Sequence, residues 1–119
     1  MFTLNHVMLI GFVGQDPEVQ TDVDKASFTR LQLASHSSYY NKEGQRIKVT
    51  HWHTVFLRPG MGKAIAGQIK KGMRIYVQGE LRTSDWKDHE GKIHRSTAVY
   101  AHDCQILASQ DKESDMNIP

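Results

Sequence analysis

Trp52 and Phe56 lie in a segment whose alternation separates an apolar set of side chains from a charged one. Side chains two residues apart share one face of a strand. In residues 47–58 this alternation puts both rings on the same face as Lys48 and Arg58. Aromatic rings can stack on planar groups such as nucleobases, while lysine and arginine neutralise phosphate. The segment is therefore a candidate surface for a polyanion that exposes planar groups.

A second candidate surface surrounds Trp86, which lies in a polar segment with no apolar neighbour in the sequence. A tryptophan in such a segment is predicted to face solvent and to be available to a ligand. Upstream of it, alternation predicts that Arg82 points outwards. The predicted inward set of this strand is Ile75, Val77 and Leu81.

The seven histidines raise the question of a metal site, because His51 and His53 share one strand face. A zinc site needs three or four converging ligands, and the single cysteine, Cys104, belongs to a different segment. The usual zinc motifs are absent from the sequence as well. We therefore predict no metal and no cofactor, and we interpret Cys104 as a small buried hydrophobe near the end of the last strand.

Residue types that could support catalysis occur without the necessary spacing. No serine, cysteine or lysine has an identifiable general base at a motif spacing, and the glycines before Lys63 lack the rest of a phosphate-binding loop. The acidic residues are scattered through predicted turns. The sequence thus predicts a binding surface and not an enzyme.

The elements that must position these residues are mainly strands. Residues 27–35 alternate in the same way as residues 47–57, and glycines in residues 41–44 and 88–91 can take the left-handed conformation of a tight turn. Both turns are predicted to project as β-hairpins. Between the strands, Met61, Ile65 and Ile69 recur at helical spacing, and Gly72 is predicted to end this helix.

Length and composition agree with one domain, because 119 residues can form one modest core and are too few for two. The chain is 39% hydrophobic and 24% charged, which is typical of a globular protein. The apolar run at residues 7–10 is too short for a signal segment or a membrane span, and one cysteine permits no internal disulfide. We therefore expect a reducing, cytoplasmic setting.

Net charge is +2, and it is divided unevenly because the last ten residues carry −2 and residues 1–109 carry +4. A basic excess of this size suits a weak attraction to phosphate, yet ordinary surfaces can be equally basic. Charge alone therefore leaves nucleic-acid binding open.

The order and spacing of several segments together resemble the bacterial single-stranded DNA-binding protein family. Residues 52–57 and 75–83, followed by Trp86, carry the likeness most strongly. It extends upstream through residues 5–11, 14–18 and 33–35, so it covers roughly residues 4–107.

This resemblance implies an all-β fold with one helix, namely a five-stranded oligonucleotide-binding (OB) barrel with projecting β-hairpins. Residues 1–109 are expected to form the OB domain, and residues 110–119 a short acidic tail without fixed structure. The implied function is sequence-independent binding and protection of single-stranded DNA in replication, recombination or repair.

Three residues match the family's stacking aromatics: Tyr39, Trp52 and Trp86. A further family position, a phenylalanine, is occupied here by Arg58, and arginine can also lie flat on a base and contact phosphate. The complete set of predicted DNA-binding residues is Tyr39, Lys42, Lys48, Trp52, Phe56, Arg58, Lys71, Arg82, Trp86 and Lys87.

Some of these residues have alternative interpretations. Trp52 and Phe56 could form a contact between subunits, because exposed aromatic patches also mark protein partners. Tyr39 could brace the base of its hairpin, and Lys71 could be a favourable charge at a helix end.

The resemblance also implies self-assembly, with a homotetramer expected first and a dimer second. His53 matches a histidine that lies at the contact between subunits in the family. Val7 and Leu9 belong to an alternating apolar strand whose edge invites pairing with another copy. These three residues form the predicted interface.

Family members usually continue into a linker with an acidic tip ending in Pro-Phe, which recruits replication and repair proteins. Residues 115–119 lack that phenylalanine, so partner recruitment is expected to be lost or weakened. Two alternative functions are kept. One is an interaction module in replication restart, resembling primosomal replication protein N, and the other is a structural OB domain whose aromatic face docks another protein.

Overall fold

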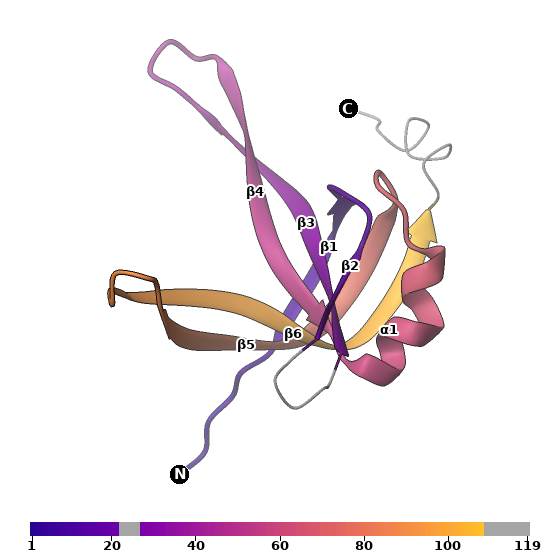
Figure 1. Ribbon diagram of the computed structural model, residues 1–119. Coiled ribbons are helices and arrows are strands. Elements are labelled where there is room, and N and C mark those ends of the chain that lie inside the picture. Colours follow the sequence, from indigo (N-terminus) through magenta and orange to yellow (C-terminus); the bar gives the residue numbers. More distant parts are fainter. Residues whose placement is uncertain (22–26, 109–119) are drawn as a thin grey trace.

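The computed structural model describes residues 1–21 and 27–108 (Figure 1). The expected tail lies outside this part of the chain. The elements of the described part, in chain order, are β1 (Val7–Val13), β2 (Glu18–Thr21), β3 (Ser27–Tyr40), β4 (Arg46–Leu57), α1 (Pro59–Ile65), the 3-10 helix η1 (Ala66–Gln68), β5 (Arg74–Lys87) and β6 (Ile93–Ala108).

Strand β1 closes the sheet into a barrel because it pairs on both sides. The strand order is β1-β5-β6-β4-β3-β2, and the end of β1 also pairs with β3 at Phe12 and Val13. The Val13 N–H donates to the carbonyl of Met73 at 2.8 Å, which ties the same end of β1 to the turn before β5. Five strands therefore form a closed barrel, and β2 extends the sheet beside β3. This arrangement confirms the predicted OB fold.

The barrel interior is filled by the inward set of each alternating strand. Fully or almost fully buried side chains include Leu31, Leu33, Val55, Leu57, Ile75 and Val77. Burying an aliphatic side chain of this size contributes about 1.5–3 kcal/mol, so this layer dominates the stability of the barrel. Cys104 is buried too, as predicted, and burial together with the charge of Asp103 raises the pKa of its thiol to about 11.

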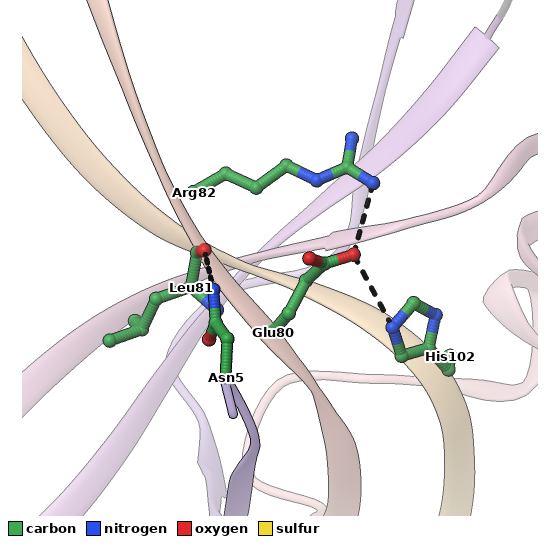
Figure 2. A network of polar contacts seen from close by, with 5 residues as sticks. All are labelled: Asn5, Glu80, Leu81, Arg82 and His102. Carbon is green, nitrogen blue, oxygen red and sulfur yellow. Dashed lines mark hydrogen bonds and ion pairs between the residues drawn. The ribbon is translucent and has the colours of Figure 1, made fainter. Parts of the chain in front are cut away.

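Leu81 differs from the prediction, because it is 45% exposed and does not face the core. The register of β5 against β6 shifts between Gln78 and Gly79, and Gly79 takes the last buried position. Beyond this point β5 leaves the barrel, so Leu81 has no interior to face. Asn5 binds the edge of β5 there: its side chain accepts the Leu81 N–H at 2.9 Å and donates to the Leu81 carbonyl at 2.8 Å (Figure 2).

Both predicted hairpins are present, and they diverge from the barrel as two arms (Figure 1). Gly44 and Gly91 have φ values of 78° and 82°, which a residue with a Cβ rarely adopts. A side chain three residues before each glycine stabilises the turn. The amide oxygen of Asn41 and the carboxylate of Asp88 each accept hydrogen bonds from two backbone N–H groups of their own turn. We call these hairpins the β3–β4 arm and the β5–β6 arm.

The helix between β4 and β5 is shorter than predicted. It ends at Ile65 and continues as η1, while Ile69 is fully buried just after it. The helical spacing therefore identified residues that face the core, but a turn containing Gly72, with φ 90°, carries the chain back to the barrel. In residues 1–21 and 27–108, no helix has the length and apolar character to cross a membrane.

Candidate nucleic-acid interface

One outer face of the barrel joins residues from four strands. The outward set of β4 continues onto β6 because Phe56 is paired with Tyr100, and from β6 onto β5 because Tyr100 is paired with Glu80. Paired residues project from the same side of a sheet. We call this surface the aromatic face and define it by Phe28, Trp52, Phe56, Arg58, Arg82, Trp86 and Tyr100.

Trp52 points to solvent from β4, in agreement with the alternation of that segment. Trp52 is 59% exposed, and its ring lies next to Gly14. A Cβ at Gly14 would come within 2.7 Å of the ring atom Cη2, so the absence of a side chain there makes room for the six-membered ring of the indole. The indole therefore contacts the backbone at Gly14 while more than half of the residue stays open to a ligand.

Phe56 is half-buried and belongs to a cluster of three rings. Its centroid lies 5.2 Å from that of Tyr100 and 6.4 Å from that of Phe28, which stands edge-on to both neighbours. Such tilted and edge-to-face contacts are favourable because ring edges are positive and ring faces negative. Sequence reasoning missed Phe28 and Tyr100, because the pairing of β4 with β3 brings Phe28 to Phe56 and the pairing of β4 with β6 brings Tyr100 there.

The cluster borders a cleft of about 180 Å³. Its polar lining comes from Arg58, Arg82 and His102, and its aromatic lining from Phe28 and Tyr100. Two predicted binding residues, Arg58 at the end of β4 and Arg82 on β5, therefore meet at one site although they are distant in the sequence.

Glu80 holds the polar side of this cleft together (Figure 2). Its Oε1 accepts a hydrogen bond from Arg82 at 3.1 Å and lies 3.5 Å from Nε2 of His102. The Arg82 guanidinium carbon also lies 4.6 Å from the centroid of the Tyr100 ring, within cation–π range. The carboxylate and the ring thus orient the guanidinium across the aromatic face.

Trp86 lies on the β5–β6 arm, on the same side of β5 as Arg82. It is 52% exposed and stacks on His94, with centroids 4.4 Å apart and planes 20° apart. Nε2 of His94 is hydrogen-bonded to Asp88 at 2.8 Å, and this bond, followed by backbone N–H donors, lowers the pKa of Asp88. His94 therefore covers one face of the indole, a role that the sequence did not reveal.

The remaining predicted residues are spread more widely. Lys42 lies in the turn of the β3–β4 arm, Lys48 on the Trp52 side of β4, and Lys87 at the end of β5. Lys71 is exposed in the turn before β5, where its backbone N–H binds Asp16 at 2.9 Å.

Tyr39 is the residue that the structure does not bring together with Trp52. The β3–β4 ladder is regular, so Tyr39 projects from the side of the sheet opposite to Trp52, which is the side of His51 and His53. Its neighbour Tyr40, which is also exposed, projects from the same side as Trp52. The assignment of Tyr39 therefore continues to depend on the resemblance alone.

The two histidines of β4 bind serines across the arm. The distance is 2.8 Å from His53 Nε2 to the Ser35 hydroxyl and 2.8 Å from His51 Nε2 to the Ser37 hydroxyl. Among residues 1–21 and 27–108, no three potential ligands gather in a way that could hold a metal ion.

The predicted interface residues of β1, Val7 and Leu9, are only partly exposed because they pack against the core. The exposed apolar side chains of this strand are instead Met8, at 63%, and Ile10, at 50%. Along these residues one edge of β1 pairs with β5, whereas its other edge pairs with no described strand until Phe12. An open edge with apolar side chains remains available for assembly.

The closed five-stranded barrel and its aromatic, basic outer face are the features of an OB-fold protein with an oligonucleotide-binding surface. The chain belongs to the single-strand binding protein family, whose model matches residues 4–107. This result confirms the family predicted from the sequence.

Two relatives show the extent of the likeness. The chain is 35% identical over 99 residues to a single-stranded DNA-binding protein of Rhizobium meliloti (strain 1021), covering 82% of this chain and 57% of that protein. It is 32% identical over 118 residues to single-stranded DNA-binding protein 1 of Xylella fastidiosa (strain 9a5c), covering 98% of this chain and 85% of that protein. The chain thus spans little more than half of the Rhizobium protein.

Two solved structures have the same fold. One is Plasmodium falciparum SSB in complex with ssDNA, with a TM-score of 0.79, 25% identity and coverage of 90% of this chain and 97% of that chain. The other is a deletion mutant of the single-stranded DNA binding protein from Thermus aquaticus, with a TM-score of 0.76, 25% identity and coverage of 90% and 52%.

Proposed function

We propose that this chain binds single-stranded DNA with little dependence on base sequence. The observation that carries the proposal is the presence of two exposed tryptophans, Trp52 and Trp86, on one face that also carries Arg58 and Arg82. Unpaired bases can stack on such rings for about 1–3 kcal/mol per base, and every base has a face to stack. The names of the family and of the relatives support the same function.

The other predicted contacts belong to this proposal. Lysines along the two arms and in the turn before β5 neutralise phosphates, namely Lys42, Lys48, Lys71 and Lys87. Two further aromatic residues, Tyr39 and Phe56, contact bases. The protein acts by binding and protection, without catalysis, in DNA replication, recombination or repair in the cytoplasm. The comparisons do not favour the alternative of a replication-restart interaction module.

Binding is expected to favour single strands strongly over duplex of the same length. Base stacking hides the faces of paired bases, so a duplex can use only the phosphate contacts. Titration of a labelled oligothymidine and of a matched duplex, followed by fluorescence anisotropy at one salt concentration, measures this difference. Equal affinity for both would contradict the proposal.

Affinity for oligothymidine is expected to fall as salt rises, because each neutralised phosphate releases condensed counterions. For single strands the slope of log affinity against log salt is about −0.7 for each phosphate contacted. Replacing one contacting residue, for example Lys48→Gln, should make the slope less negative by about that amount. A slope that does not change in the lysine variants would remove these residues from the DNA path.

We also propose that the protein forms a homo-oligomer, a tetramer first and a dimer second, through the edge of β1 and the face that carries His53. Since Val7 and Leu9 pack against the core, Met8→Lys with Ile10→Lys is the cleaner test, because both side chains are exposed. Light scattering should give a smaller mass for the double variant than for the unchanged chain. A monomer at micromolar concentration before any substitution would refute assembly.

A further inference from the structure

We propose that the cleft beside Tyr100 binds one unstacked nucleobase of the strand and prefers guanine. This inference rests on the proposed function and goes beyond it, because it assigns a base preference to one position of a surface that is otherwise indifferent to sequence. Four features of the cleft support it: its size, its aromatic walls, the guanidinium plane of Arg82, and the hydrogen-bond donors of Arg58, which have no partner among the described residues.

The size of the cleft suits one base. Its volume is about 180 Å³. For comparison, an engineered protein cavity of about 150 Å³ holds a benzene molecule. A single flat heterocycle therefore fits.

The walls of the cleft are suited to a flat guest. Phe28 and Tyr100 line it, and their rings stand at 81° to each other with centroids 6.1 Å apart. One ring can thus contact the face of a base while the other contacts its edge. Phe56 supports both rings from the side without lining the cleft.

The face of Tyr100 already accepts a planar polar group. The Arg82 guanidinium carbon lies 4.6 Å from the ring centroid, and Arg82 also donates a hydrogen bond to Glu80 (Figure 2). Unstacked bases are commonly held on aromatic rings and on guanidinium planes. Because the guanidinium covers this face of the Tyr100 ring, a base entering the cleft stacks on the guanidinium plane, which the ring holds in place.

Arg58 supplies the donors that choose among bases. It lines the cleft and is exposed, and no residue of the described chain is within hydrogen-bond or ion-pair distance of its guanidinium. The guanidinium fork matches two neighbouring acceptors, which guanine offers as O6 and N7. Adenine has an amino donor in place of O6, and thymine lacks the second acceptor. Guanine is therefore the base that uses both donors.

The test uses four oligomers that differ at one central position of a thymidine tract: thymine, guanine, adenine or 7-deazaguanine, which lacks N7. A bidentate contact discriminates by about 1–3 kcal/mol, or about five- to 150-fold. Because the cleft is partly open to solvent, we expect the guanine oligomer to bind about five- to tenfold more tightly than oligothymidine. The adenine and 7-deazaguanine oligomers should bind within about twofold of oligothymidine.

Two variants assign the preference to the cleft. Arg58→Lys keeps the charge and removes the fork, and Tyr100→Leu keeps apolar bulk and removes the ring; each should reduce the ratio of guanine to thymine affinity to about one. Arg46→Lys is the matched control, because Arg46 lies on the β3–β4 arm away from the cleft, and it should leave the ratio unchanged. Thermal unfolding verifies that each variant is folded.

The outcomes distinguish the guanine preference of the cleft from single-strand binding itself. Equal binding of the thymine and guanine oligomers by the unchanged chain would overturn the cleft assignment and leave single-strand binding intact. An equal gain with adenine, or a preference that survives in both folded cleft variants, would also overturn it. Failure to bind any of the oligomers would refute the proposed function, and the cleft assignment with it.

Discussion

Replacing Trp52 with alanine is expected to weaken binding of oligothymidine by about 1–3 kcal/mol, and replacing Trp86 by a similar amount, because each variant loses one stacked base. Both residues are more than half exposed, so neither ring contributes to the core and the fold should be retained. The double variant combines the two losses and has the largest effect on function that we predict. Anisotropy of a labelled oligomer measures affinity without depending on tryptophan fluorescence.

Trp52→Phe and Trp86→Phe are the matched controls, because phenylalanine keeps a ring that can stack while it loses indole area. They should recover most of the affinity. Thermal unfolding curves that superimpose on those of the unchanged chain would show that affinity, and not stability, has changed. A folded double-alanine variant that binds as tightly as the unchanged chain would exclude both tryptophans from the interface.

Replacing Gly79 with alanine is expected to destabilise the barrel by about 1–3 kcal/mol or more, as overpacking of a close-packed interior does. A Cβ at Gly79 would overlap the carbonyl oxygen of Tyr100 and lie 2.8 Å from Cα of Ala101. Both atoms belong to the backbone of β6, so relief requires a shift of the whole strand. Denaturant unfolding should show a lower midpoint for this variant.

Gly60→Ala is the control for this prediction, since no atom lies within 4 Å of the position that its Cβ would take and the residue is in α1. Alanine is the better helix former, so the stability of this variant should be unchanged or slightly higher. If the two alanine variants unfold at the same denaturant concentration, the close approach of β5 and β6 at Gly79 is not a determinant of stability.

The sequence by itself determined the local elements and the family. Alternation in residues 47–58 separated the buried side chains of Val55 and Leu57 from the exposed side chain of Trp52, because a strand has a period of two whatever it pairs with. Gly44 and Gly91 marked the hairpin turns, because their positive φ values suit residues without a Cβ. These signals depend on neighbours in the chain, so they can be read without the fold.

The sequence patterns do not predict where the barrel core and the helix end. Leu81 continues the inward alternation of β5 and is nevertheless exposed, because the barrel ends at Gly79. Ile69 has the helical spacing of a core residue and is buried, although the helix ends before it. Periodicity predicted which side a residue faces, but not how far the core extends along the element.

Only the tertiary structure decided how the candidate site is assembled. Phe56 and Tyr100 are 44 positions apart and become neighbours because β4 and β6 run parallel in one register, and a shift of one residue would turn the Tyr100 side chain to the other face. The β4–β6 and β5–β6 registers together bring Arg58 and Arg82 to one cleft. The pairing of strands that are distant in the sequence depends on how all the strands pack their buried faces in the closed barrel. No local pattern in the sequence therefore specifies these contacts.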